Sequence, residues 1–141
     1  MGMPLAMSHC FLIVHDYDEA LAFYRDVVGL EVRNDVSFEG QRWLTLGAPG
    51  QPGVEIGLEI PGYFPHTAPA DKQATADLVA KGLLPGIIFT VDNCDETFEK
   101  IRASGADVIQ EPFDQPYGVR DCAFRDPSGT MVRFSQRLTS R

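Results

Sequence analysis

A short segment occurs twice in the sequence, in diverged form, and this repeat limits the folds that the chain can adopt. The two copies are VHDYDEALAFYR at residues 14–25 and VDNCDETFEKIR at residues 91–102. Four identical residues recur at a constant offset of 77 positions (91 − 14 for the first pair): Val14 and Val91, Asp18 and Asp95, Glu19 and Glu96, Arg25 and Arg102. Identities at one offset indicate a tandem duplication of one supersecondary unit.

Both copies carry the signals of a helix that follows a strand. Asp16 and Asn93 are favoured N-cap residues, and each is followed three positions later by a glutamate, as in a capping box. Glycines suited to a helix C-cap, Gly29 and Gly105, come after the two predicted helices. An apolar, β-rich run precedes each helix, CFLIV in the first copy and GIIFTV in the second. Each copy therefore predicts a strand and then a helix.

Three more strands are predicted after each helix, separated by turn signals such as Glu39-Gly40 and the sequence DPSG. They cover residues 30–38, 41–47 and 54–60 in the first half, and residues 107–114, 119–125 and 130–136 in the second half. The predicted fold class is therefore α+β, with two tandem βαβββ modules at residues 1–60 and 86–141 that together make one domain. Residues 61–85 contain four prolines and are too long for a tight connection, so they predict a linker or flap with a short helix near Asp71–Lys81.

The charge balance excludes some classes of partner. The chain has 20 acidic and 12 basic residues, for a formal net charge of −8, whereas a nucleic-acid-binding protein needs a basic face. Its three cysteines are widely separated, so the sequence predicts neither a disulfide framework nor a thiolate metal site. With neither a signal peptide nor a long apolar run, we expect no membrane association and a cytoplasmic location.

Three pieces of the sequence, in this order, resemble the vicinal oxygen chelate superfamily: VHDYDEALAFYRDVVGLEV, TVDNCDETFEKIRASGADVIQEP and AFRDPSGTMVRF. That superfamily includes glyoxalase I, extradiol dioxygenases, methylmalonyl-CoA epimerase and the bleomycin- and fosfomycin-resistance proteins. The resemblance covers nearly the whole chain. It implies that each module curls its sheet into a half-barrel and that two modules face each other around a cavity. We also expect a homodimer, because the apolar side of each half-sheet needs a facing module and the long linker at residues 61–85 permits modules to pair between chains.

The metal-dependent enzymes of that superfamily place one ligand on the first strand and one on the last strand of each module. The resemblance puts these positions at His9, at Glu59 or Glu55, at Gly86 and at Arg133. Glycine has no side chain, and a guanidinium has no lone pair to give a cation. We therefore expect no resident metal, with His9 and Glu59 as relics of the site. The alternative is a divalent metal such as Zn, Ni, Fe or Mn.

Strand alternation assigns further residues to the expected cavity. Ile56 and Leu58 form the apolar face of the fourth strand, which leaves Glu55 and Glu59 on the other face. Arg133 likewise lies opposite the face of its apolar neighbours, and we expect it to contact Glu59, Glu55 or an anionic group of a ligand. The expected ligand-binding residues are His9, Phe11, Trp43, Glu55, Glu59, Tyr117 and Arg133.

Simpler roles for three of these residues stay open: a structural histidine at His9, a core aromatic at Trp43 and a turn residue at Tyr117. Three functions are also open. The first is a small-molecule-binding protein with a degenerate metal site. The second is a metal-dependent lyase, isomerase or dioxygenase that uses His9 and Glu59, and the third is an accessory protein without a small ligand. Gly86 and Arg133 favour the first.

Overall fold

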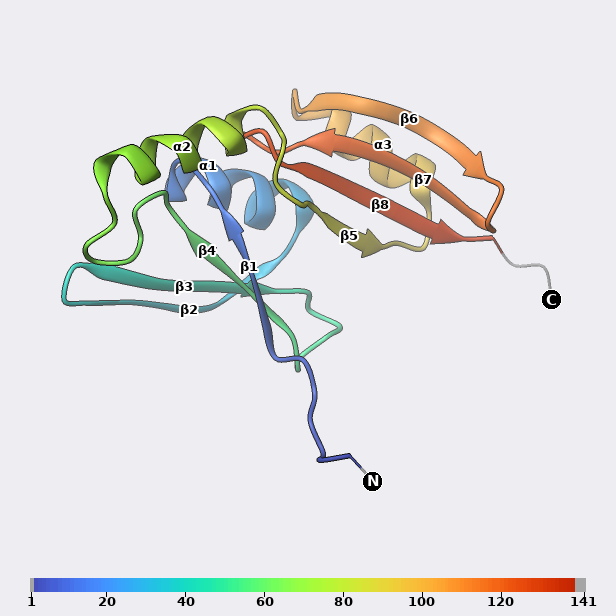
Figure 1. Cartoon of the computed structure of the whole chain (residues 1–141). Coiled ribbons are helices and arrows are strands. Elements are labelled where there is room, and N and C mark those ends of the chain that lie inside the picture. The colour runs from blue at the N-terminus through green and yellow to red at the C-terminus, as the bar shows by residue number, and fades with distance from the viewer. Residues whose placement is uncertain (1, 139–141) are drawn as a thin grey trace. The chain divides into compact units, whose positions relative to one another are not determined.

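The computed structural model describes residues 2–138 of the chain. It divides into two compact units, Met1–Gln73 and Ala74–Arg141. Each unit holds a strand, a helix and three more strands, so the predicted α+β fold with two βαβββ modules is confirmed (Figure 1). The elements are β1 (His9–Ile13), α1 (Tyr17–Leu21), η1 (Ala22–Val28), β2 (Glu31–Phe38), β3 (Gln41–Gly47), β4 (Glu55–Glu59), α2 (Pro69–Ala80), β5 (Ile87–Thr90), α3 (Cys94–Ala103), β6 (Asp107–Gln115), β7 (Val119–Arg125) and β8 (Met131–Arg137).

The first unit is a four-stranded sheet in the order β1-β4-β3-β2. β1 runs parallel to β4, and the other neighbours are antiparallel. Apolar side chains on one face of the sheet are buried together with side chains of the helix: Leu12, Leu44, Leu46, Ile56, Leu58, Leu21, Phe23 and Tyr24. Because side chains alternate along a strand, the residues between these buried positions lie on the opposite face.

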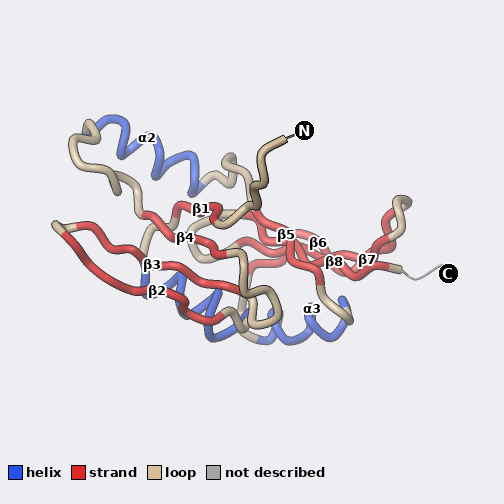
Figure 2. The backbone as a smooth tube through the Cα atoms, turned by 90° about the horizontal axis from the view of Figure 1, so that it is seen from below, coloured by secondary structure: helices blue, strands red, loops and turns tan. Residues whose placement is uncertain are grey.

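The second unit repeats this arrangement in the order β5-β8-β7-β6, again with the first and last strands parallel. Helix α3 packs against β6, β7 and β8, and Figure 2 shows it lying along one face of the sheet. The core of this unit contains Phe98 and Ile101 of α3 together with Phe124 and Phe134 of the strands. The other face of the sheet carries the side chains that alternate with these strand residues.

Both predicted helix N-termini are capped as expected. The Asp16 carboxylate accepts a hydrogen bond from the backbone N–H of Glu19 at 2.8 Å, and the Asn93 side chain does the same for Glu96 at 3.0 Å. Gly29 ends the first helix in the left-handed conformation, with φ 99°. The first helix differs from expectation in one respect, because after Leu21 it continues as the π-helix η1.

The DPSG turn fixes how β7 pairs with β8. The Asp126 carboxylate accepts hydrogen bonds from the backbone N–H groups of Ser128, Gly129 and Thr130, each at 2.9 Å. Gly129 has φ +115°, and a Cβ there would lie 2.6 Å from the carbonyl oxygen of Val79. This turn therefore needs its glycine both for conformation and for space, and it sets the register of the following strand.

The segment between the predicted modules contains α2, close to the helix expected near Asp71–Lys81. The division between the two compact units falls inside this helix, after Gln73. Among residues 2–138, no helix is long and apolar enough to cross a membrane.

Candidate functional site

One face of the first sheet presents three aromatic rings. The rings of His9 and Phe11 on β1 stack with centroids 6.4 Å apart. The Trp43 ring on β3 lies 5.7 Å from the His9 ring and 5.9 Å from the Phe11 ring. Phe11 is 47% exposed and Trp43 is 37% exposed, although both are large and apolar. We call these three residues the aromatic face; a surface of this kind suits a flat apolar ligand.

A glycine on the neighbouring strand makes room for the Phe11 ring. β1 and β4 pair so that Phe11 lies opposite Gly57. A Cβ at position 57 would come within 2.3 Å of a Phe11 ring carbon. The ring therefore lies flat over the backbone of β4, and this holds it within the aromatic face rather than upright from the sheet.

Glu55 stands beside the aromatic face and is held by several polar partners. Its carboxylate accepts hydrogen bonds from the Thr45 hydroxyl at 2.7 Å and from the Asn34 amide at 3.1 Å. The His9 Nε2 lies 3.5 Å from the same carboxylate oxygen. The Thr45 hydrogen bond is the main cause of a lowered Glu55 pKa, to which His9 and Asn34 add. Glu55 is thus an anchored anion at neutral pH, and it lies beside the His9 ring.

Glu59 is a different kind of carboxylate on the same face. The register places it opposite Ile13, two residues beyond Gly57 on β4. Its side chain is half-buried, and burial raises its pKa. Within the described part of the first unit, no side chain donates a hydrogen bond to this carboxylate. Glu59 is therefore available to a hydrogen-bond donor or a cation of a ligand.

Arg133 of the second unit has a carboxylate partner within that unit. Its Nη1 lies 3.3 Å from Oδ1 of Asp121 and donates a hydrogen bond to Oε1 of Gln110 at 2.9 Å. The expected partners were Glu59, Glu55 or an anionic group of a ligand; within its own unit the carboxylate that Arg133 contacts is Asp121. The physical reason is register: Asp121 lies opposite Ser135, one step along the same face from Arg133, so the nearest carboxylate is on the adjacent strand β7.

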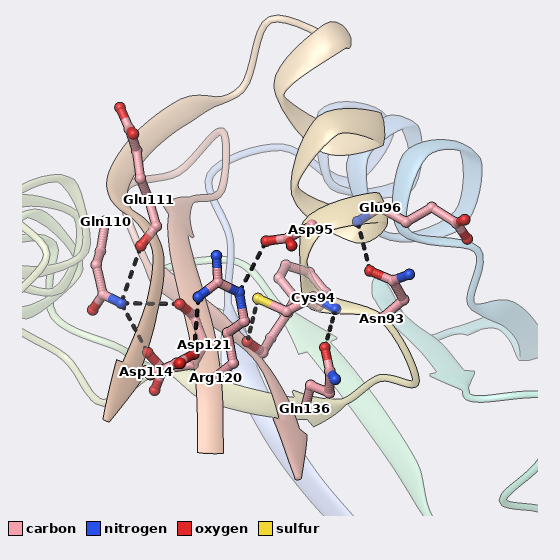
Figure 3. Close-up of polar contacts among 11 residues, drawn as sticks. Asn93, Cys94, Asp95, Glu96, Gln110, Glu111, Asp114, Arg120, Asp121 and Gln136 are labelled. Carbon is pink, nitrogen blue, oxygen red and sulfur yellow. Dashed lines mark hydrogen bonds and ion pairs between the residues drawn. The ribbon is translucent and has the colours of Figure 1, made fainter. Parts of the chain in front are cut away.

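Asp121 is the most buried acid near Arg133, with 1% of its surface exposed. Its Oδ1 accepts hydrogen bonds from the Gln110 amide at 2.8 Å and the Gln115 amide at 3.0 Å, the first of which is drawn in Figure 3. Burial by itself raises the pKa of Asp121, but the two amides and the Arg133 charge outweigh burial and leave the pKa lowered. Asp121 is therefore an ionised, fully engaged anchor for the guanidinium.

Arg120 precedes Asp121 on β7, and its side chain lies on the opposite face of the sheet. Its guanidinium bridges Asp95 of α3 at 3.0 Å and Asp114 of β6 at 2.8 Å, as Figure 3 shows. Adjacent residues on a strand point to opposite faces, so the Arg120 network ties helix to sheet while Asp121 faces away from the helix.

In the second unit, Gly86 and Arg133 occupy the two strand positions at which the resemblance places metal ligands. A Cβ at Gly86 would lie 2.0 Å from the carbonyl oxygen of Met131, so β5 and β8 approach too closely there for a side chain. Arg133 carries a positive charge. Among residues 2–138, no group of three or more His, Cys, Asp or Glu side chains is arranged to hold a metal ion.

The structure thus gathers four of the seven predicted ligand-binding residues, His9, Phe11, Trp43 and Glu55, on one face of the first unit, with Glu59 further along it. Tyr117 lies in the turn between β6 and β7 and is 70% exposed. The sequence prediction missed Gly57, Thr45, Asn34, Gln110 and Asp121. For Asp121 a signal existed, because counting back from the DPSG turn places it beside Arg133.

The sequence matches the family model of the Glyoxalase/Bleomycin resistance protein/Dioxygenase superfamily over residues 6–134. The chain belongs to this superfamily. Among solved structures it is similar to UcmS2, with 35% identity and a TM-score of 0.87, covering 94% of this chain and 98% of that one. It also shares the fold of TnmS3, described as an antibiotic binding protein from Streptomyces sp. CB03234, with 23% identity and a TM-score of 0.75 over 96% and 99% of the two chains.

The curated proteins that the sequence resembles differ in whether their function is known. An uncharacterized protein of Bacillus subtilis, YurT, is 29% identical over 89% of this chain and 94% of its own length. A lactoylglutathione lyase of Salmonella typhimurium is 26% identical over 92% and 91% of the two chains. The relatives thus include both an enzyme and, among the structures, a binding protein.

Proposed function

We propose that this chain is a small-molecule-binding protein that holds a flat aromatic ligand, such as an aromatic antibiotic, on the aromatic face and does so without a resident metal. The observation that carries the proposal is the exposed cluster of His9, Phe11 and Trp43 beside the anchored Glu55. Exposed aromatic rings held in fixed positions stack on a planar ligand at little cost in side-chain entropy. The antibiotic-binding description of TnmS3, which shares the fold, supports this choice.

The metal-free part of the proposal rests on the second unit. Gly86 has no space for a ligating side chain, and Arg133 is a cation held by Asp121. Two of the four positions that hold a metal in the superfamily's metal enzymes therefore carry nothing that can coordinate one. We also propose a homodimer, because both sheets expose apolar side chains in a single chain.

Trp43, the only tryptophan, provides the test. Daunorubicin, a polycyclic aromatic antibiotic, and 2-acetylnaphthalene, a minimal flat probe, are titrated into the protein in EDTA while Trp43 emission is followed. We expect saturable quenching, and a roughly five- to tenfold weaker affinity for Phe11→Ala because one stacking ring is lost. Phe64→Ala, which removes an exposed phenylalanine from a loop, is the matched control and should leave affinity unchanged. Absence of saturable quenching by both probes would contradict the proposal.

A lyase is the second candidate, because His9 and Glu55 form a close polar pair and lactoylglutathione lyases are among the relatives. Formation of lactoylglutathione by the chain supplied with Ni²⁺ or Zn²⁺, and its loss in His9→Ala, would favour this candidate over the binding protein.

A further inference from the structure

Arg133 retains hydrogen-bonding capacity after its internal contacts are made. A guanidinium has five N–H donors. The two on Nη1 face Gln110 and Asp121, and one on Nη2 meets the thioether of Met131, a weak acceptor, at 3.6 Å. Within the described part of the second unit, the Nε donor and the other Nη2 donor have no acceptor. The Arg133 side chain is 21% exposed, so these donors are not sealed in the core.

The position of the guanidinium is fixed by the groups around it. Gln110 both accepts from Arg133 and donates to Asp121, which closes a three-membered network. Gln115 adds a second amide to Asp121. A side chain held by Gln110 and Asp121 keeps its remaining donors at one place on the sheet, and such preorganised donors lose little entropy when they bind a ligand atom.

An exposed apolar side chain lies beside these donors on the same face of the sheet. Ile88 on β5 lies directly opposite Arg133 in the register and is 64% exposed. On the other side Ala123 lies opposite Arg133 on β7 and is buried. A ligand with a flat apolar body would cover Ile88 and bring one acceptor atom to the guanidinium.

The charge of the ligand's acceptor group determines whether that group can bind at Arg133. Asp121 already neutralises Arg133, and its lowered pKa keeps it ionised at neutral pH. A ligand carboxylate would therefore add an unbalanced negative charge to a half-buried pair, in a chain whose net charge is −8. An uncharged oxygen acceptor takes the free N–H donors without this cost.

We infer that Arg133, held by Asp121 and Gln110, forms a binding site for the carbonyl oxygen of an uncharged aromatic ligand. This inference rests on the proposed binding function for the choice of an aromatic ligand, and it concerns a site on the second unit alone, at Arg133 and Ile88. Asp121 and Gln110 are positioning residues, and Arg133 is the residue that contacts the ligand.

The test uses three naphthalene probes that differ in one substituent: 2-acetylnaphthalene has a carbonyl, 2-ethylnaphthalene has no acceptor, and 2-naphthoate is an anion. Their affinities for the full chain are measured by equilibrium dialysis. One hydrogen bond corresponds to a factor of about five in affinity. We therefore expect the ketone to bind about fivefold more tightly than the ethyl compound, and the anion to bind no more tightly than the ethyl compound.

Variants show whether Arg133 is the cause. Arg133→Met combined with Asp121→Asn removes both charges together, so no buried ion is left unpaired, and it should reduce the ketone preference to about one. The control is Arg120→Met, which removes an arginine from the opposite face and should keep the fivefold preference. Circular dichroism establishes that each variant is folded.

The outcomes separate the two proposals. Equal binding of the ketone and the ethyl compound by the unaltered protein, or a ketone preference that survives in the double variant, overturns the Arg133 site and leaves the binding function standing. Tightest binding of the anion overturns the choice of a neutral acceptor. Binding of none of the three contradicts the proposed function, and the Arg133 site with it.

Discussion

Glu55 and Glu59 lie on the same face of the first sheet, but their pKa values are shifted in opposite directions. Glu55 accepts two hydrogen bonds, and its pKa is lowered; Glu59 is half-buried without a donor in the described part of its unit, and its pKa is raised from an ordinary value of 4.5. Ionised Glu59 therefore costs folding free energy.

The sign of this effect gives a prediction for Glu59. A carboxyl whose pKa is higher in the folded state than in the unfolded state stabilises the fold below the unfolded value and loses that contribution as pH rises through the folded value. We expect Glu59→Gln to raise the melting temperature at pH 7 and to have little effect near pH 4. A lower melting temperature at pH 7 would mean that Glu59 has a partner that stabilises its charge.

Arg133 and Asp121 allow a double-mutant cycle. Arg133→Met leaves the buried Asp121 carboxylate without its counter-charge, and should lower the free energy of unfolding by about 2 kcal/mol or more. Adding Asp121→Asn should recover much of the loss, because the two side chains act as a coupled pair. Urea unfolding of the four proteins measures this, and additive losses would show that the pair is not coupled.

For single residues, the sequence predicted which face of a sheet a side chain lies on better than it predicted which residue that side chain contacts. Strand alternation correctly put Arg133 on the face away from Val132 and Phe134, which are both buried. It did not identify Asp121, because alternation alone does not give the register between β7 and β8, which has to be counted back from the DPSG turn. The pKa directions of Glu55 and Glu59 were also beyond prediction, because that of Glu55 depends on donors from neighbouring strands and that of Glu59 depends on burial.

Secondary structure elements were the most predictable level of the fold. Every strand predicted from alternation and turn signals is present within a residue or two at each end. The π-helical segment η1 was not predicted, because apolar spacing does not distinguish it from an α-helix. The shifts of register in β6, between Val108 and Phe113, were likewise invisible in the alternation pattern.

The contact between α3 and β7 predicts the reactivity of the cysteines. Cys94 and Cys122 are buried, and burial raises the pKa of each thiol, to about 12 for Cys122. Cys10 on β1 is partly exposed. We expect a thiol reagent such as Ellman's reagent to label about one cysteine per native chain at pH 8, and all three after denaturation. Labelling of Cys94 or Cys122 in the native state would show that α3 opens from the sheet.

At the scale of the whole molecule, duplication explains both the fold and the asymmetry of the site. The two modules share their capped helices and strand order, yet the first carries the aromatic face while the second carries Gly86 and Arg133. The repeat could predict the shared architecture. It could not predict what each copy does, because function depends on the positions where the copies differ.

Exposed apolar residues on both units predict self-association. They include Val36 and Phe38 on β2 and Phe113 on β6. Surface of this kind is rarely left uncovered in a folded protein. We expect sedimentation equilibrium at micromolar concentration to give twice the chain mass of 15.6 kDa. A mass equal to that of one chain would contradict the proposed homodimer.

Trp43 emission distinguishes metal-free binding of a flat aromatic ligand from binding that needs a metal. Trp43 emission is followed during titration of 2-acetylnaphthalene into protein treated with EDTA, and into the same protein dialysed against Zn²⁺, Ni²⁺, Fe²⁺ or Mn²⁺. We expect saturable quenching with the same affinity in every sample. Quenching that occurs only in a metal-loaded sample, with about one metal bound per chain and lost in His9→Ala, would contradict this expectation.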